Sequence, residues 1–284
     1  MNFISRAKRS IPEYEFSFFG FKRGTIGVLS APGSTGKGFL VLETLISMAS
    51  HNMADHVFIK SFNKKVGYIS LEDGDDVIDN RIQALCSSFN LNNDAKNLNR
   101  IDENFEIQTG YGDDYIVYNP KATVNDPKIQ ENRKRLAHFC TGKELVVIDT
   151  LSMFNVGDEN SNADMAQLIV QLKHIAEDKN CSILIVHHSS KAATMNGQSD
   201  NQASTRGASS LIDNARYQIT MQTMTQKEAA ALQIHDYKMY VQVNFPKVNY
   251  VSPLSTLWYK RERNGTLTYL EHGFGKIKES HAEY

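Results

Sequence analysis

The amino-acid sequence predicts an α/β fold with a mainly parallel, twisted sheet that is flanked by helices and extended by antiparallel strands at its C-terminal edge. From residue 25 onward, short β-branched or apolar runs alternate with longer runs of helical periodicity, which is typical of a parallel sheet. After residue 205, strand-like runs dominate and indicate antiparallel additions. The 284 residues contain no internal repeat and no low-complexity linker, so we expect one domain over residues 24–284.

The individual elements follow from the local pattern in chain order. Strands of the parallel part are expected at 25–30, 66–71, 144–149 and 181–187. Helices between them are expected at 37–50, 75–89, 128–140 and 163–179, where apolar residues recur at i, i+3 and i+4. The antiparallel additions are expected at Tyr217–Met221, Tyr237–Asn244, Leu257–Arg261 and Thr266–Tyr269. A capping box from Thr225 to Glu228 predicts a short helix between the first two of these strands.

Residues 1–23 differ in character from the rest of the chain. Basic residues are interspersed with phenylalanines there, and neither a strand nor a helix period is present. We therefore interpret this segment as an N-terminal arm that precedes the domain. Because large aromatic and basic side chains are effective contact residues, we expect the arm to dock onto a neighbouring subunit.

The composition excludes several classes of protein. The 31 Lys and Arg residues nearly balance the 32 Asp and Glu residues, so any nucleic acid must be bound by a local basic surface. No run approaches the roughly 20 consecutive apolar residues that span a bilayer, and no apolar segment follows the basic N-terminal residues as in a secretion signal. The three cysteines are widely spaced, which argues against a disulfide framework and a thiolate metal site. We expect a cytoplasmic protein without a membrane partner.

The strongest motif is a glycine-rich segment, Ala31–Gly38, between a predicted strand and a predicted helix. Glycines let the backbone turn its N–H groups inward, the helix directs its positive end to the same point, and Lys37 adds a full charge. The segment therefore predicts a phosphate-binding loop, with ATP as the expected ligand; the alternative is a simple turn that joins strand to helix. The candidate nucleotide-binding residues are Pro32, Gly33, Ser34, Thr35, Gly36, Lys37, Gly38 and Phe39.

Position 38 departs from the usual pattern of such loops. Gly38 stands where a serine or threonine normally gives a hydroxyl to Mg²⁺, and Ala31 replaces the usual first glycine. A water molecule or the hydroxyl of Thr35 could fill the vacant position on the ion. We therefore expect ATP binding with an altered dependence on Mg²⁺.

Two carboxylates end strand-like runs. Asp149 closes the apolar run that begins at Leu145, where such ATPases reach the Mg²⁺ shell; the alternative is a turn or a helix cap. Glu72 follows the run that begins at Val66, and a carboxylate beside the γ-phosphate can accept a proton from the attacking water. Other acids after Glu72 suit the beginning of a helix instead.

A pair of histidines, His187 and His188, ends another strand-like run. A polar side chain at this edge can bond the γ-phosphate and report its loss to the following loop. Adjacent residues of a strand point to opposite faces, so the pair is a poor zinc site. For His187 the alternative is a packed core histidine.

A long polar stretch, 189–205, follows and ends at Arg206; Arg216 comes shortly after it. Segments of this length are usually functional or disordered. An arginine that enters the ATP site of a neighbouring subunit would stabilise transition-state charge; the alternative for each arginine is a surface ion pair.

With these motifs in order, the chain resembles the RepA-type hexameric replicative helicases of IncQ-like plasmids, which have a RecA-like P-loop NTPase core. The resemblance covers about residues 20–270 and rests on the phosphate loop, Glu72–Asp73, Arg81, Asp149, His187–His188 and Asn214–Arg216. It is densest in Val147–Leu151, Met165–Gln167, Cys181–Ile183, His187–His188 and Lys247–Tyr250.

The resemblance implies a role for each matching residue. Lys37 would hold phosphates, Glu72 would be the catalytic acid/base, Asp149 would lie on the magnesium side, and His188 would sense the γ-phosphate. Arg216 would be the finger donated in trans, with Arg206 as its rival and Arg81 as a further nucleotide contact.

The family's activity would be ATP hydrolysis by a ring hexamer that moves along single-stranded DNA, alongside an initiator and a primase. The loops 150–162 and 189–206 would face the channel. Lys191 and Arg206 offer the positive charge for DNA, a small surplus that six subunits would multiply. Two alternatives stay open: a RecA-like nucleotide-binding assembly or regulatory module with little hydrolysis, which Gly38 favours, and a kinase built on the same core.

Overall fold

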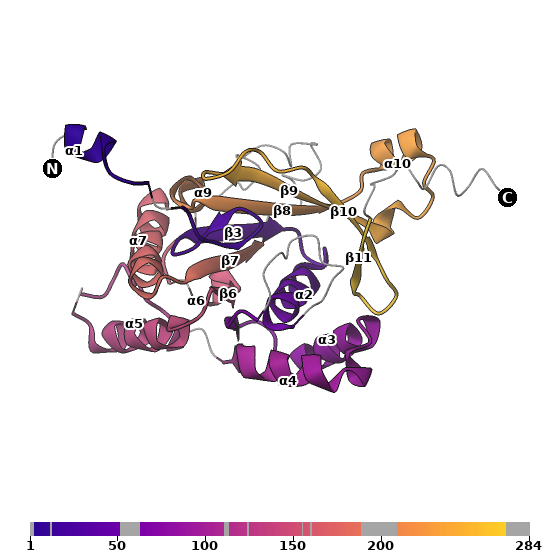
Figure 1. Cartoon of the computed structure of the whole chain (residues 1–284), viewed down its shortest axis with the longest axis horizontal. Helices are drawn as coiled ribbons and strands as arrows, with labels where there is room; N and C mark the ends of the chain where they lie inside the picture. Colours follow the sequence, from indigo (N-terminus) through magenta and orange to yellow (C-terminus); the bar gives the residue numbers. More distant parts are fainter. Residues whose placement is uncertain are drawn as a thin grey trace.

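A nine-stranded sheet runs through the part of the chain that the structure describes, with strand order β11-β10-β9-β8-β3-β7-β6-β4-β5 (Figure 1). This structure is a computed structural model that describes residues 3–11, 13–51, 63–110, 114–123, 125–154, 156–159, 161–188 and 209–270. The strands are β3 (Ile26–Ala31), β4 (Val66–Ser70), β5 (Phe105–Thr109), β6 (Leu145–Asp149), β7 (Ser182–His188), β8 (Tyr217–Thr223), β9 (Tyr240–Val248), β10 (Leu257–Arg261) and β11 (Leu267–Tyr269).

The direction of the strands confirms the predicted fold class. The strands from β8 to β5 in this order pair in parallel, whereas β9, β10 and β11 are added antiparallel at the other edge. Strands β3, β4 and β6 are buried along their whole length, since helices cover both faces of a parallel sheet. The continuous apolar runs that predicted these strands are the consequence of that double coverage.

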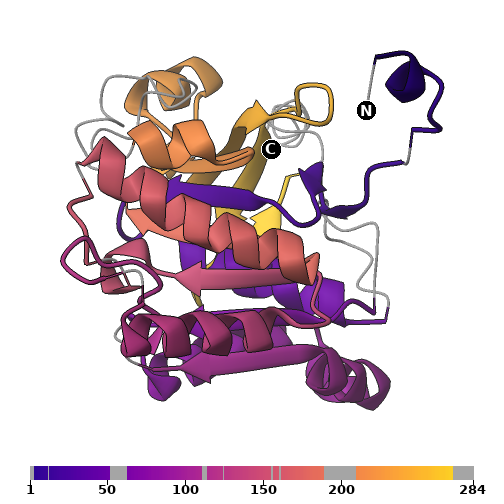
Figure 2. The same cartoon turned by 90° about the vertical axis from the view of Figure 1, so that its left-hand side faces the viewer.

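Two groups of helices cover the two faces of the sheet (Figures 1 and 2). The first group is α2 (Lys37–Ala49), α3 (Asp75–Ser88) and α4 (Ala95–Asn104), and the second is α5 (Pro127–Cys140), α7 (Asn162–Lys179) and α9 (Ser209–Asn214). Each group contributes to its own buried apolar cluster. Short helices complete the set: α1 (Phe3–Ala7), α6 (Leu151–Phe154), α10 (Gln226–Leu232), η1 (Leu91–Asn93) and η4 (Tyr237–Met239).

The helix ends agree with local sequence signals. Thr225 and Glu228 form the predicted capping box of α10, with each side chain bonded to the backbone N–H of the other. The Asp126 side chain accepts hydrogen bonds from two N–H groups at the beginning of α5, and Pro127 occupies the first position of that helix.

Three elements differ from the sequence prediction. The strand expected at Tyr237–Asn244 begins at Tyr240 and extends to Val248, because Tyr237–Met239 form a turn of 3₁₀ helix. Helix α4 and strand β5 were not predicted. Strand β5 is a half-exposed edge strand, so its sequence lacks the apolar run of its neighbours.

The N-terminal segment also has more structure than its sequence pattern predicted. Residues Phe16–Phe18 (β1) and Phe21–Lys22 (β2) form a small hairpin. Phe21 is fully buried and stacks on Tyr217 with ring centroids 4.8 Å apart, and the Tyr217 hydroxyl donates a hydrogen bond to the carbonyl of Phe19. The hairpin therefore belongs to the body of the molecule.

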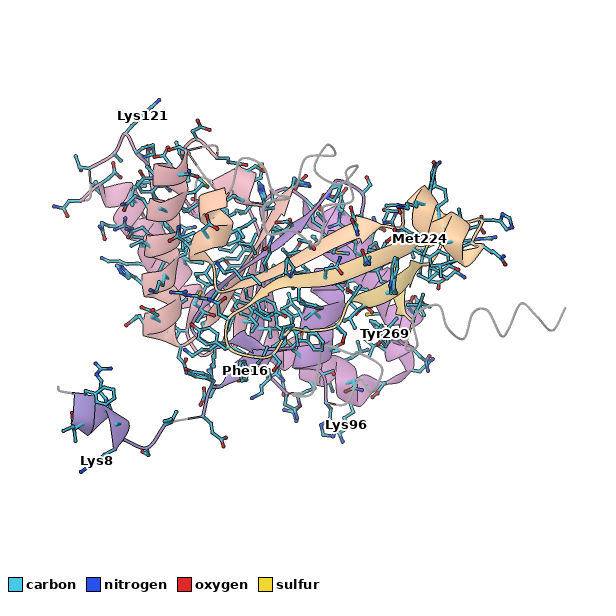
Figure 3. The ribbon with its side chains drawn as sticks, turned by 90° about the horizontal axis from the view of Figure 1, so that it is seen from above. Lys8, Phe16, Lys96, Lys121, Met224 and Tyr269 are labelled. Atoms are coloured by element: carbon cyan, nitrogen blue, oxygen red, sulfur yellow. The ribbon has the colours of Figure 1, made fainter. Side chains whose placement is uncertain are left out.

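The residues before the hairpin stand away from that body (Figures 2 and 3). Helix α1 lies there, and Phe3 and Ile11 are 84% and 88% exposed. Among the helices that the structure describes, none is long and apolar enough to cross a membrane.

Candidate nucleotide-binding site

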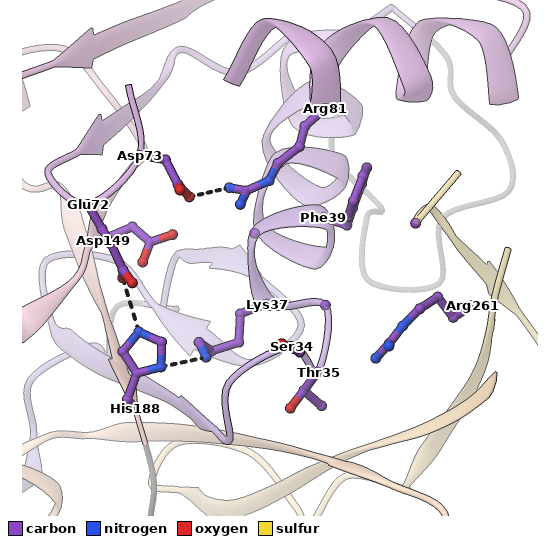
Figure 4. Close-up of a pocket in the computed structure, with 13 residues that line it drawn as sticks. Ser34, Thr35, Lys37, Phe39, Glu72, Asp73, Arg81, Asp149, His188 and Arg261 are labelled. Carbon is purple, nitrogen blue, oxygen red and sulfur yellow. Dashed lines mark hydrogen bonds and ion pairs between the residues drawn. The ribbon is translucent and has the colours of Figure 1, made fainter. Parts of the chain in front are cut away.

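The predicted site residues converge at one edge of the sheet. Because β3, β4, β6 and β7 are parallel neighbours, their carboxyl ends meet there. A pocket of about 350 Å³ lies at this edge. It is lined by Ser34, Thr35, Gly36, Lys37, Gly38, Phe39, Glu72, Asp73, Arg81, Asp149, His188, Arg261 and Gly265 (Figure 4).

The phosphate loop is shaped for an anion. Gly36 adopts a left-handed conformation with φ of 101° and is the N-cap of α2, a position where glycine offers no side chain to cap the helix. The Thr35 hydroxyl donates a 2.6 Å hydrogen bond to the carbonyl of Pro32 and so closes the turn. Helix α2 therefore presents N-terminal N–H groups to the pocket that its N-cap residue leaves available.

Lys37 is buried at the centre of the site. Its ammonium nitrogen lies 3.2 Å from the carbonyl oxygens of Ala31 and Pro32 and 3.0 Å from Nδ1 of His188. Burial lowers the pKa of Lys37, although the charges of Asp149 and Glu72 oppose this shift. Since three acceptors surround the ammonium group, a phosphate can bind Lys37 only by replacing some of these contacts.

His188 joins Lys37 to Glu72 (Figure 4). Its Nε2 lies 3.0 Å from the Glu72 carboxylate. An ammonium group only donates, so Nδ1 accepts from Lys37 and the proton of the neutral ring lies on Nε2, which donates to Glu72. Burial alone would raise the pKa of Glu72, but the hydrogen bond and charge of His188 and the charge of Lys37 outweigh it and leave this pKa below its ordinary value.

Asp149 ends β6 and faces the same pocket. Its carboxylate accepts a 2.7 Å hydrogen bond from the hydroxyl of Tyr68, on the neighbouring strand β4. Burial raises the pKa of Asp149, while the Tyr68 hydrogen bond and the charge of Lys37 act in the opposite direction.

The space above Gly38 is occupied by Arg81. A Cβ atom at position 38 would lie 2.7 Å from Nη1 of Arg81, and the same nitrogen forms a 2.7 Å ion pair with Asp73. The carboxylates of Asp149 and Glu72 face the pocket as ligands that Mg²⁺ accepts through water, but a glycine at position 38 offers no side-chain oxygen and is covered by a guanidinium. The residues therefore do not fit the usual direct ligation of Mg²⁺ by the loop, and Thr35 is engaged within the turn.

The remaining predicted residues are distributed as follows. Pro32 and Gly33 belong to the loop but do not line the pocket. His187 is buried, and burial together with the charges of His188 and Lys37 lowers its pKa to about 4, which agrees with the packing alternative.

Arg216 lies away from this pocket. Its backbone N–H donates to the carbonyl of Ile26, at the beginning of β3, so the residue lies at the amino edge of the parallel strands. It follows α9, whose last carbonyls, those of Ile212 and Asp213, accept hydrogen bonds from Lys247. The other two predicted residues, Lys191 and Arg206, lie outside the described residues.

Sequence reasoning missed three members of the site. Asp73 was assigned to helix N-terminal charge, yet it holds Arg81 over the loop. Arg261 and Gly265 come from the hairpin β10–β11. The available signal was strand direction: two antiparallel steps after β8 return the carboxyl end of β10 to the edge where the phosphate loop lies.

Comparisons with known proteins agree with this description. A family model described as an AAA domain matches residues 4–194. A solved structure of a helicase ATPase domain is similar with a TM-score of 0.56 and 17% identity, over 88% of this chain and 86% of that one. The RadB recombinase structure is similar with a TM-score of 0.51 and 13% identity, over 86% of this chain and 90% of that one. The two structures confirm the expected RecA-like α/β architecture; the finer resemblance to RepA-type helicases stays a prediction.

Proposed function

This chain belongs to the AAA domain family, and from that premise we propose that it is an ATP hydrolase that drives a DNA helicase. One observation carries the proposal: the hydrogen-bonded series Lys37–His188–Glu72 at the end of the phosphate loop. It links a phosphate-binding cation to a carboxylate that can act as a base.

The chemistry follows from the protonation states. Because its pKa is below the ordinary value, Glu72 is ionised at neutral pH and can accept a proton from a water that attacks the terminal phosphate. Lys37 and the N-terminal N–H groups of α2 hold the transferred phosphate and its developing charge. Arg81 adds a second cation from α3. Mg²⁺ would accompany ATP and supply charge neutralisation beside Asp149.

His188 is suited to report the state of the nucleotide. A γ-phosphate competes with His188 for the ammonium group of Lys37, so binding weakens one of the two bonds that hold the imidazole. When the phosphate leaves, the bond to Lys37 can form again. His188 is the last residue of β7, so this exchange acts where the chain enters the segment 189–208.

We propose that the active form is a ring hexamer on single-stranded DNA. Arg216 is at the opposite edge of its own sheet, so it could serve an ATP site only in trans, with Arg206 as its rival. Lys191 and Arg206 would contact DNA phosphates in the channel. The exposed apolar side chains of the N-terminal segment, such as Phe3 and Ile11, would dock onto the adjacent subunit. Within this proposal the chain acts in plasmid replication, in the cytoplasm, with an initiator and a primase.

Steady-state ATP hydrolysis tests the proposal. The rate should rise when single-stranded DNA is added and vanish in Lys37→Ala, whereas Lys96→Ala, at an exposed lysine, should behave as wild type. The protein should also displace one strand of a short forked duplex. Hydrolysis without any displacement, at every salt concentration, would refute the helicase step and leave the ATPase.

The assembly is tested separately. Removing residues 1–15 should lower the mass of the oligomer in sedimentation while the body of the domain stays folded, since the buried hairpin begins at Phe16. An unchanged oligomer mass would refute the docking role.

A second candidate function is a RecA-like nucleotide-gated assembly or regulatory module with little hydrolysis. The guanidinium over Gly38 favours it, because the loop lacks its usual oxygen ligand. Tight ATP binding and ring formation without turnover above the Lys37→Ala blank would select this function.

A further inference from the structure

Arg261 lies across the nucleotide pocket from Glu72 and His188 (Figure 4). It is the last residue of β10 and pairs with Leu267 of β11. Since β10 runs in the same direction as β3, its carboxyl end reaches the edge where the phosphate loop lies. The side chain extends from this strand toward the loop.

The hairpin that carries Arg261 is fixed against both α2 and α3. Gly265, in its turn, has φ of 92°, and a Cβ at that position would lie 2.5 Å from the ring of Phe39. Asn264 donates a 3.1 Å hydrogen bond to the hydroxyl of Ser88 at the end of α3. The strand end therefore holds Arg261 at a defined place beside the pocket.

The guanidinium of Arg261 is buried without compensation from the described part of the chain. Its Nε and Nη2 atoms are buried and have no hydrogen-bond partner among the described residues. Nη2 is 3.9 Å from the position of a Cβ at Gly36, the N-cap of α2, so a second positive group lies beside it. Burial lowers the pKa of Arg261. A buried cation beside a helix N-terminus is unfavourable until an anion arrives.

We propose that Arg261 binds the phosphate group nearest the ribose of the nucleotide held by the phosphate loop of the same subunit. This inference rests on the proposed function, because it assumes that the pocket takes a nucleotide. Glu72 and His188 mark the end of the pocket where the terminal phosphate reacts, and Arg261 is at the other side. Nε and Nη2 are the two parallel donors of one edge of the guanidinium, so one phosphate can accept both hydrogen bonds.

Binding of ADP, ATP and GDP to the full chain and its variants, by calorimetry, tests the proposal. Arg261→Gln should weaken ADP and ATP by the same factor, roughly 10- to 100-fold for a pair of charge-assisted hydrogen bonds. The same factor should apply to GDP, because the contact is to phosphate. Arg261→Lys should lie between wild type and Arg261→Gln, since an ammonium group cannot form the parallel pair. Arg263→Gln, at an exposed arginine of the same hairpin, should bind as wild type.

Thermal unfolding without nucleotide separates binding from structure. Removing an uncompensated buried charge should leave the Tm of Arg261→Gln equal to or above that of wild type, whereas the rise in Tm produced by ADP should shrink. A Tm that falls without nucleotide would assign Arg261 a structural role and overturn the proposal.

The remaining outcomes are equally distinct. Unchanged ADP affinity in Arg261→Gln would overturn the inference. A loss confined to ATP would place Arg261 at the terminal phosphate, and a loss confined to adenine nucleotides would place it at the base; both overturn it as well. If Lys37→Ala bound ADP as tightly as wild type, the proposed function itself would fail.

Discussion

The substitution Gly38→Ser restores the residue type that phosphate loops usually carry and tests what replaces it in this chain. The new Cβ would lie 2.7 Å from Nη1 of Arg81 and 3.2 Å from its Cζ. The contact is with the far end of a long, flexible side chain, so Arg81 should swing away. Because Nη1 is also the atom that contacts Asp73, the ion pair should break.

The effect on folding should be small. The side chains of Arg81 and Asp73 are 24% and 28% exposed, so their ion pair contributes about 1 kcal/mol or less. Serine recovers about 0.5 kcal/mol of helix propensity relative to glycine within α2. The free energy of unfolding, from urea denaturation, should therefore change by less than about 1 kcal/mol.

The effect on nucleotide binding should appear in the response to Mg²⁺. In the wild type, Arg81 already places positive charge above Gly38, so the Kd for ATP should respond weakly when EDTA removes Mg²⁺. In Gly38→Ser the hydroxyl offers a metal ligand and the guanidinium is displaced. EDTA should then raise the Kd roughly 10-fold, which corresponds to one charge-assisted contact of about 1.4 kcal/mol.

Gly38→Ala is the matched control, since it displaces Arg81 without adding an oxygen. It should bind ATP more weakly than wild type both with and without Mg²⁺. The reasoning would be refuted if wild type and Gly38→Ser showed the same strong dependence on Mg²⁺, or if Gly38→Ala bound ATP as wild type in both conditions.

Three further substitutions test the chemistry of the site. Glu72→Gln keeps the size of the side chain but removes the base, so kcat for ATP hydrolysis should fall roughly 10²–10⁴-fold while ATP still binds; an unaltered kcat would contradict this role. Tyr68→Phe leaves the Asp149 carboxylate without the hydroxyl now 2.7 Å away, so urea denaturation at pH 7 should give a free energy of unfolding lower by about 1–2 kcal/mol, and no change would mean that water replaces the hydroxyl fully. His187 has a folded-state pKa of about 4 against an ordinary 6.5, so the unfolded chain binds more protons between these values and stability should fall by up to about 3 kcal/mol from pH 7 to pH 4. His187→Gln should flatten that part of the stability profile, and a wild-type stability that is constant over this range would speak against the shift.

Much of the site could be predicted because it depends on buried parallel strands. Such strands are apolar throughout, so a carboxylate or imidazole at the end of one, as in Asp149 or His188, is visible in the sequence. The phosphate loop is visible for the same reason, since it follows a buried strand and opens a helix. Edge and half-exposed elements such as β5 have no comparable signal.

The members that were missed depend on tertiary arrangement. Nothing in the local sequence shows that Arg81 enters the space of the side chain that Gly38 lacks; the two are brought together by the packing of α3 beside α2. Arg261 reaches the pocket through the pairing order of β8, β9 and β10, which a periodicity in single strands does not encode.

The position of β3 in the sheet has a consequence for how the protein is made. Its neighbours β7 and β8 come late in the chain: Ile26 pairs with Ile183, and Gly27 with Tyr217. A ribosome therefore releases the phosphate loop long before the strands that flank β3 exist, whereas pairs such as β8–β9 and β10–β11 join segments made close together in time. Until β8 emerges, β3 has an unpaired apolar edge, and a nascent chain at that stage is a client for chaperones rather than a nucleotide-binding protein.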